Sequence, residues 1–412
     1  FEYLARNIGL YTIAVTGLPW YVAMYGRLGP FFTDRLLIHD HINRLASGVH
    51  GDTGSIQYFL AQLGYGAFPW IGLFPLGFVA FLNLLPRGDE AHEAKRRTGI
   101  LLAMWAAAAF VLFNAMITKF HHYIFPAVPP LSLLIGVFLD RALPKSVVTR
   151  REWGAVLLTL LGSLALVLGA GSLYGNLRGV IPEDVTGAEK ASWIADHGLP
   201  GWLLAVLLLL GVAALTLSVR LTRSTKDAGE EPEDEGAVSS RERSERPVFA
   251  LALLAAAVVV AFAGRDLSWV LPERPLGHEK LIQLFVYNYN RAFPDYLDYR
   301  PILSGFALTF VGLLVLASYQ RLRKVALYSV LSTAFLFSAW SLNVYMIDLT
   351  PHWGQRELIK RYYAERSGAQ EPLIAWQMNW KGENIYTGNR VHVFVQLDNK
   401  AINKWMDKPP GT

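Results

Sequence analysis

The chain has 412 residues, of which 53% are hydrophobic and only 17% are charged, with a net charge of +5 and a mean hydropathy of +0.29. Soluble domains carry about a quarter charged residues, so this composition excludes an ordinary soluble protein. The absence of cysteine excludes disulfides and thiolate metal sites. Most basic residues lie between apolar runs, so we interpret the positive charge as a topology signal and expect no binding to nucleic acid.

The apolar runs are each about as long as a bilayer crossing requires and are nearly free of charge at their centres. They predict an all-α polytopic membrane protein with about nine transmembrane helices in residues 1–346. The runs lie at 8–24, 61–85, 99–117, 123–139, 153–173, 202–219, 248–263, 302–319 and 325–346.

The segments between the runs predict the orientation. Lys and Arg are concentrated in the loops after every second run, and such loops are normally cytoplasmic. This rule places the hydrophilic linker 220–246 in the cytoplasm, and its mixed charge and low hydrophobicity predict disorder. Four segments are then expected on the outer face: 29–56, 118–122, 174–201 and 265–301.

The last stretch, 347–412, has the composition of a water-soluble segment. Residues 356–368 predict an amphipathic helix, and residues 372–380 and 390–397 predict two strands around a turn at 382–389. We therefore expect a small α/β domain on the outer face, apparently cut short. Because the sequence begins at Phe1 without a Met, we also expect an internal fragment of a longer protein.

Polar and ionisable residues gather in the stretch 117–130, ITKFHHYIFPAVPP, between two apolar runs. Such groups at a membrane boundary need water, a partner or a ligand. Lys119 and Tyr123 can supply a cation and a hydroxyl to an anion at the membrane surface, so a lipid phosphate is the first candidate ligand. The prolines also suit the first turn of a helix, where they fix its entry angle.

The stretch 34–50, DRLLIHDHINRLASGVH, predicts a short interfacial helix. His41 and Arg44 share a polar face at i, i+3 spacing. A plainer interpretation is a surface helix whose Arg44 binds any lipid phosphate. The apolar side of this helix comprises Leu36, Leu37, Ile42 and Leu45.

Several histidines and aspartates predicted on one side of the membrane invite a comparison with metal sites. Zinc requires three or four convergent ligands, and no spacing here is diagnostic. We favour histidines that hydrogen-bond to headgroups or backbone, and we expect no metal and no cofactor. The residues compared are His39, Asp40, His41, His50, Asp52, His121 and His122.

Four motifs follow each other in the order and rough spacing of the family-39 glycosyltransferases, which include relatives of the protein O-mannosyltransferases and of the lipid A aminoarabinose transferase. The resemblance covers about residues 5–140 and implies a GT-C fold in a bacterial inner membrane, with the active face and the C-terminal domain periplasmic. It also implies a polyprenyl-phosphate sugar as donor and a lipid or a protein as acceptor. The motifs are GLPWYVAMYGR, HDHINRLASG, FPWIGLFPLGF and KFHHYIFPAVPPLSLLIG.

The resemblance implies roles for individual residues. Lys119, Tyr123 and Arg44 match positions that meet the donor phosphate in the aminoarabinose transferase pattern, and His41 matches a histidine without an assigned role. His121 and His122 are possible site-lining residues. The family's catalytic carboxylate belongs to an outer loop that would precede this sequence, so we name no catalytic base.

Two other classes of function stay open at this stage. A transporter or lipid flippase would place ionisable residues at mid-span and broken helices at corresponding positions. A non-enzymatic scaffold would bind a partner through the C-terminal domain. The polar residues here collect instead at the predicted outer edge, which favours an enzyme acting on lipid-linked sugars.

Overall fold

The computed structural model describes residues 2–47, 54–74, 76–77, 90–143, 150–178, 200–226, 240–268, 280–281, 297, 299–320, 322–376, 381–394 and 400–407. The chain forms two compact units. One unit comprises residues 1–291 and 299–334, and the other comprises residues 292–298 and 335–412.

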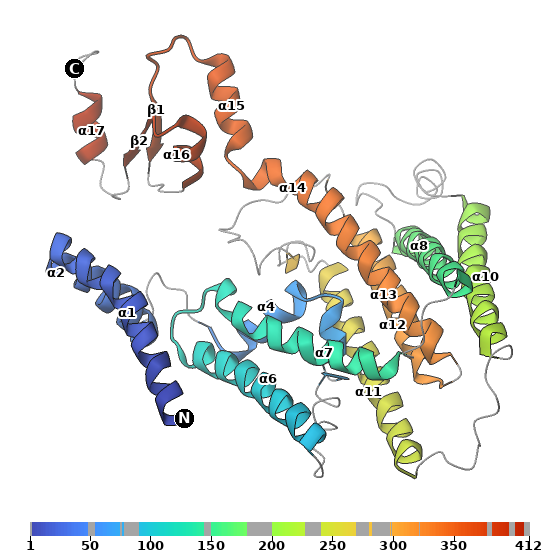
Figure 1. Cartoon of the computed structure of the whole chain (residues 1–412). Helices are drawn as coiled ribbons and strands as arrows, with labels where there is room; N and C mark the ends of the chain where they lie inside the picture. Colours follow the sequence, from blue (N-terminus) through green and yellow to red (C-terminus); the bar gives the residue numbers. More distant parts are fainter. Residues whose placement is uncertain are drawn as a thin grey trace. The chain divides into compact units, whose positions relative to one another are not determined.

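Eight helices in the described ranges are long and apolar enough to cross a membrane, so the protein is an all-α polytopic membrane protein, as the sequence predicts (Figure 1). Most of the apolar runs coincide with one helix each. The spans lie in α1 (Glu2–Leu28), α6 (Glu90–Ala115), η4 (His121–Ala127) with α7 (Val128–Ala142), α8 (Arg150–Arg178), α10 (Gly201–Lys226), α11 (Ser240–Ser268), α12 (Arg300–Ser318), and α13 (Arg323–Trp340) with η7 (Ser341–Tyr345) and α14 (Met346–Trp353).

The predicted second span, 61–85, differs from the structure. Its first part belongs to α4 (Ile56–Gly66), which ends before Pro69, and the short 3-10 helix η3 (Trp70–Leu73) follows. Proline has no N–H to extend the hydrogen-bond ladder, so one continuous helix across this stretch was a wrong prediction. Residues 78–85 lie outside the described part of the chain.

The predicted disordered linker, 220–246, is helical at both ends, because α10 continues to Lys226 and α11 begins at Ser240. A helix gains one hydrogen bond for each residue added to it, so the membrane helices can extend beyond their apolar spans into polar sequence. The disorder prediction is wrong for these ends, and its centre, 227–239, lies outside the described residues. Most residues of the predicted outer segments, 174–201 and 265–301, also lie outside the described part of the chain.

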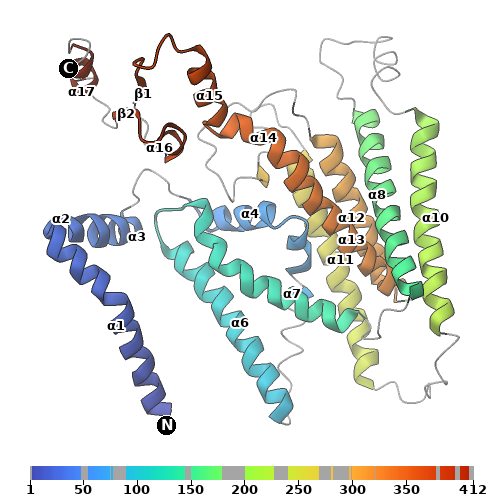
Figure 2. The ribbon, with the colours of Figure 1, turned by 45° about the horizontal axis from the view of Figure 1, so that its top comes forward.

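Helix α8 packs against both α10 and α12, and Figure 2 shows α8 and α10 side by side. Glycines permit the close approach: a Cβ atom at Gly305 would lie 2.5 Å from the carbonyl oxygen of Val167, and one at Gly171 would lie 2.9 Å from that of Pro301. Small residues at helix crossings are typical of membrane bundles. The Ser218 hydroxyl also donates to the Ala155 carbonyl at 3.0 Å, which ties α10 to α8.

The second unit contains α15 (Arg356–Glu365), β1 (Leu373–Trp376), α16 (Lys381–Thr387), β2 (Val391–Phe394) and α17 (Lys400–Met406). The strands pair in parallel, with Leu373 opposite Val391. A helix, α16, therefore stands where a turn was predicted at 382–389, because parallel strands need a crossover and cannot be joined by a tight turn. Gly388 and Asn389, both with positive φ, follow α16. The predicted helix at 356–368 is found over Arg356–Glu365, and the strands predicted at 372–380 and 390–397 are found over Leu373–Trp376 and Val391–Phe394. Residues 377–380 and 395–397 lie outside the described part of the chain.

Candidate anion site at the ends of α6 and α7

Three short helices follow α1: α2 (Pro30–Thr33), the π-helix η1 (Asp34–Asn43) and α3 (Arg44–Ala46). Leu37, Ile42 and Leu45 are 43%, 52% and 47% exposed. Exposed apolar side chains along a short polar helix suit a segment lying on a bilayer surface. The local structure thus fits the interfacial helix expected from the sequence.

Backbone hydrogen bonds join this segment to the stretch between α6 and α7. The N–H of Ile117 donates to the carbonyl of Leu45 at 3.1 Å, and the N–H of Thr118 donates to the carbonyl of Arg44 at 3.2 Å. The two stretches singled out in the sequence are therefore neighbours in space.

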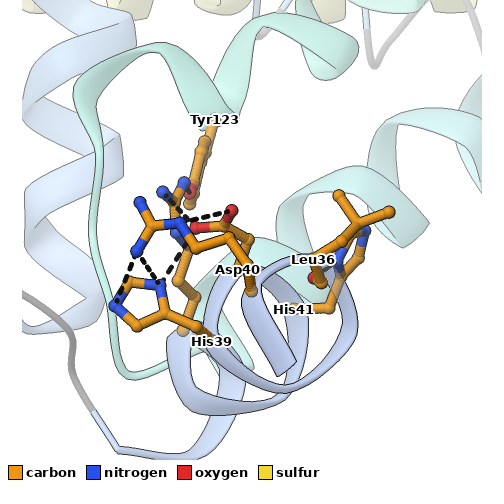
Figure 3. Close-up of polar contacts among 7 residues, drawn as sticks. Leu36, His39, Asp40, His41 and Tyr123 are labelled. Carbon is orange, nitrogen blue, oxygen red and sulfur yellow. Dashed lines mark hydrogen bonds and ion pairs between the residues drawn. The ribbon is translucent and has the colours of Figure 1, made fainter. Parts of the chain in front are cut away.

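Arg44 belongs to a polar cluster with Arg35, His39, Asp40 and Tyr123, which we call the Arg44 cluster. Figure 3 labels His39, Asp40 and Tyr123 of this cluster. Arg44 Nη1 donates to the Tyr123 hydroxyl at 3.2 Å, and its Nη2 donates to Asp40 Oδ1 at 2.9 Å. Burial lowers the pKa of Arg44, but the bonds to Tyr123 and Asp40 outweigh it and raise the pKa, so the guanidinium stays charged. Its buried Nε has no hydrogen-bond partner among the described residues.

Asp40 holds the cluster together. Its carboxylate accepts from Arg44, lies 3.7 Å from Arg35 Nε and lies 3.1 Å from His39 Nδ1. Burial raises the pKa of Asp40, but the His39 hydrogen bond and the charges of Arg44 and Arg35 outweigh it, so the net pKa is lowered. The pairing of Asp40 with Arg44 was not predicted, although their i, i+4 spacing on a helix is a recognisable signal.

Lys119 is placed differently from Arg44. Its ammonium donates to the carbonyls of Phe113, Asn114 and Met116, at 3.3, 2.6 and 2.5 Å, and its side chain is buried. All three ammonium hydrogens are thereby used at the C-terminal end of α6, where a cation also offsets the helix dipole. Burial lowers the pKa of Lys119.

Tyr123 and Lys119 share an aromatic surrounding. The ring of Tyr123 lies 5.5 Å from that of Phe113, and both rings pack against a buried core that includes Phe59. Lys119 Nζ lies 5.5 Å from the centre of the Phe59 ring. The structure thus brings Lys119 and Tyr123 to the same core, but only Tyr123 bonds directly to Arg44.

The three histidines named from the family resemblance, His41, His121 and His122, occupy different places. His122 is exposed and its ring lies 5.1 Å from that of Tyr123, whereas His121 is buried beside it. His41 donates from Nδ1 to the carbonyl of Leu36 and lies apart from Tyr123 (Figure 3). His122 therefore borders the Arg44 cluster through Tyr123, and the expected shared polar face of His41 and Arg44 is not formed.

Within the described ranges, no group of three His, Asp or Glu residues could hold a metal ion, while His50 and Asp52 lie outside those ranges. Arg35, Arg44 and Lys119 carry three positive charges in this region, against the two negative charges of Asp34 and Asp40. A surplus of fixed cations with hydroxyl and imidazole groups nearby can bind an anion.

Comparisons with known proteins bear on what that anion is. No protein-family model and no solved structure matches the chain. One similar curated protein is the undecaprenyl phosphate-alpha-4-amino-4-deoxy-L-arabinose arabinosyl transferase 2 of Pseudomonas fluorescens (strain Pf0-1). It is 29% identical over 196 residues, which are 47% of this chain and 32% of that protein.

The corresponding transferase of Yersinia pestis (strain Pestoides F) is 29% identical over 131 residues, which are 32% of this chain and 22% of that protein. The chain is similar to these aminoarabinose transferases over the matched regions. This finding confirms the family resemblance read from the four motifs. The matched regions span about a third or less of the length of these relatives.

Proposed function

We propose that this chain is part of a membrane glycosyltransferase that binds a polyprenyl-phosphate sugar at the Arg44 cluster. The relatives are named for transfer of an aminoarabinose from undecaprenyl phosphate, and the multi-span architecture suits a lipid-linked donor. The proposal also includes an outer-face site in a bacterial inner membrane and a lipid or a protein as acceptor.

The observation that carries the proposal is the state of Arg44. Two partners from different elements, Asp40 and Tyr123, fix the guanidinium, while its buried Nε–H has no acceptor in the described residues. The Arg44 side chain as a whole keeps 27% of its surface exposed, so a ligand can approach it although Nε itself is covered. Phosphate oxygens are well matched to guanidinium donors.

In glycosyl transfer, Arg44 and Tyr123 would stabilise the phosphate that leaves the sugar. Negative charge develops on the departing lipid phosphate as its bond to the sugar breaks, and donors already in place stabilise that charge without reorganising. Tyr123 accepts from Arg44 and keeps its own hydroxyl hydrogen for a phosphate oxygen.

Lys119 adds a positive charge, and a direct bond to phosphate would replace one of its three carbonyl partners. His122 would line the approach to the phosphate. We assign no residue of this chain as the catalytic base.

Binding of undecaprenyl phosphate to the purified chain in mixed micelles tests the proposal, with the uncharged alcohol undecaprenol as reference. We expect the phosphate to bind at least 10-fold more tightly than the alcohol, and we expect Arg44→Gln to remove that preference. Arg27→Gln, at the exposed end of α1, is the charge-matched control and should retain the preference. Equal binding of phosphate and alcohol, or an unchanged preference in Arg44→Gln, would overturn the proposal.

A further inference from the structure

A second candidate binding feature lies in the helical bundle, away from the Arg44 cluster. A groove with a volume of about 640 Å³ runs between α8, α10, α12 and α13. Its walls are mainly aliphatic, with Leu166, Leu208 and Leu313 among them, and the polar residues that also line it are Thr216, Thr309, Ser329 and Arg220. Some wall residues, such as Leu308 and Val212, are 52% and 56% exposed, so the groove opens sideways along the surface that spans the membrane.

The composition of the groove favours an apolar ligand over a small polar one. A buried water needs two to four polar partners, and two of the three hydroxyl groups in the lining, those of Thr216 and Ser329, already donate to backbone carbonyls of their own helices. The volume falls within the range of about 300–1,000 Å³ that is typical of ligand sites. A flexible hydrocarbon chain lying along the helices would fill such a groove.

Arg220 lines one end of this groove, at the C-terminal end of the span in α10. No carboxylate in the described ranges pairs with Arg220, and its side chain is exposed. A cation at the mouth of an apolar groove, at the edge of a span, complements an anionic lipid headgroup.

The topology separates this groove end from the Arg44 cluster. Three of the candidate spans found in the described ranges, those in η4 with α7, in α8 and in α10, lie between the start of η4 at His121 and Arg220. An odd number of crossings puts the two residues at opposite faces of the membrane. A donor whose phosphate is held by Arg44 would therefore not place its phosphate at Arg220.

We propose that this groove binds one chain of an anionic phospholipid of the bilayer, with its headgroup paired to Arg220. The occupant lies in the leaflet opposite the Arg44 cluster. The proposal does not depend on the glycosyltransferase function, because none of the residues involved belongs to the Arg44 cluster.

Glycine offers a way to fill the groove without disturbing the helices. Gly312 lines the groove, and a Cβ atom at this position meets nothing within 4 Å. Gly312→Leu would place its side chain where the lipid chain lies. Gly136, in α7, has the same open surroundings and does not line the groove, so Gly136→Leu is the matched control.

The test is native mass spectrometry of the purified chain titrated with phosphatidylglycerol or with phosphatidylcholine of identical acyl chains. We expect one phosphatidylglycerol molecule to be retained, bound about fivefold more tightly than phosphatidylcholine. This factor corresponds to the attraction of about 1 kcal/mol between one surface cation and an anionic headgroup. Arg220→Gln should remove the difference between the two lipids, and Gly312→Leu should weaken both about tenfold.

Gly136→Leu and Arg97→Gln should bind like the unchanged protein. Arg97 is an exposed arginine near the N-terminal end of α6 that pairs with Glu93. When Arg97 is replaced, Glu93 still has Arg96 as its partner. Equal retention of the two lipids by the unchanged chain would overturn the proposal, as would full retention by Gly312→Leu. Displacement of the retained lipid by equimolar undecaprenyl phosphate would also overturn it, because the groove would then bind the donor chain.

Discussion

Arg44 donates a hydrogen bond of 3.2 Å to the hydroxyl of Tyr123, across 79 positions of sequence. The bond joins the segment after α1 to the entry of α7, and Asp40 fixes the guanidinium from its other side at 2.9 Å. A rigidly held guanidinium loses little entropy when it binds a ligand, which is why such an arrangement suits an anion site.

Removal of the Tyr123 hydroxyl tests this relationship. Tyr123→Phe keeps the ring in its aromatic core but deletes the acceptor for Arg44 Nη1. Hydrogen bonds to charged groups contribute about 1.5–3 kcal/mol, so we expect the affinity for undecaprenyl phosphate to fall about 10-fold or more. Equilibrium binding measures the change, and Tyr25→Phe on the exposed side of α1 is the control. An affinity equal to that of the unchanged chain would contradict a role for Tyr123 in the site.

The Asp40 carboxylate should give the cluster a defined pH dependence. Its pKa in the folded chain is below the ordinary value of 3.8, so its stabilising contribution is complete above that value and is lost as the pH falls through the lowered pKa. We expect Asp40→Asn to reduce the free energy of unfolding by about 0.5–1 kcal/mol at pH 7, as part-exposed ion pairs do.

Denaturant unfolding in detergent at several pH values measures this difference. The gap between the variant and the unchanged chain should persist down to about pH 4 and close below it. Asp34→Asn, on the same π-helix but exposed, is the control. A gap that closes already near pH 6 would contradict the lowered pKa.

Lys119 should matter for stability because of its three carbonyl partners. Lys119→Met leaves these carbonyls without their donor, and we expect the free energy of unfolding to fall by about 1–3 kcal/mol. Arg97→Met, an exposed position, should change it by less than about 0.5 kcal/mol. If Lys119→Met weakens phosphate binding and leaves stability unchanged, Lys119 is a phosphate ligand and its capping role is wrong.

The contact between α8 and α12 should depend on glycine. A Cβ atom at Gly305 would lie 2.5 Å from the carbonyl oxygen of Val167, so Gly305→Ala must separate the helices. We expect a loss of about 1–3 kcal/mol in the free energy of unfolding, which is typical of overpacking. Gly312→Ala lies on the same helix in open space and should be neutral or slightly stabilising. Equal stability of the two variants would show that the close packing is unimportant.

The proposed orientation is open to chemical labelling, because the chain has no cysteine. A cysteine at Ile38, which is 45% exposed, should react with a membrane-impermeant maleimide in intact spheroplasts. A cysteine at the exposed Arg97 should react only after permeabilisation. The reverse pattern would place the Arg44 cluster on the cytoplasmic face and contradict the proposed site.

The sequence by itself determined the class of protein and most of its spans. Long apolar runs have no stable alternative to membrane helices, since each backbone polar group must be satisfied within the helix. It also drew attention to Arg44, Lys119 and Tyr123, because polar residues at a span boundary are conspicuous against apolar neighbours. It did not distinguish a crossover helix from a turn at 382–389, because strand direction depends on pairing between distant segments.

Only the tertiary structure decided which of these residues meet. Arg44 and Tyr123 come together through backbone hydrogen bonds at Ile117 and Thr118, whereas Lys119 turns to the end of α6 and His41 to its own helix. The physical reason is that a side chain's partner is set by competition among all nearby donors and acceptors, including backbone carbonyls freed where a helix ends. Spacing along the chain shows only which residues are neighbours in sequence. Which donor meets which acceptor depends on the three-dimensional arrangement of all of them.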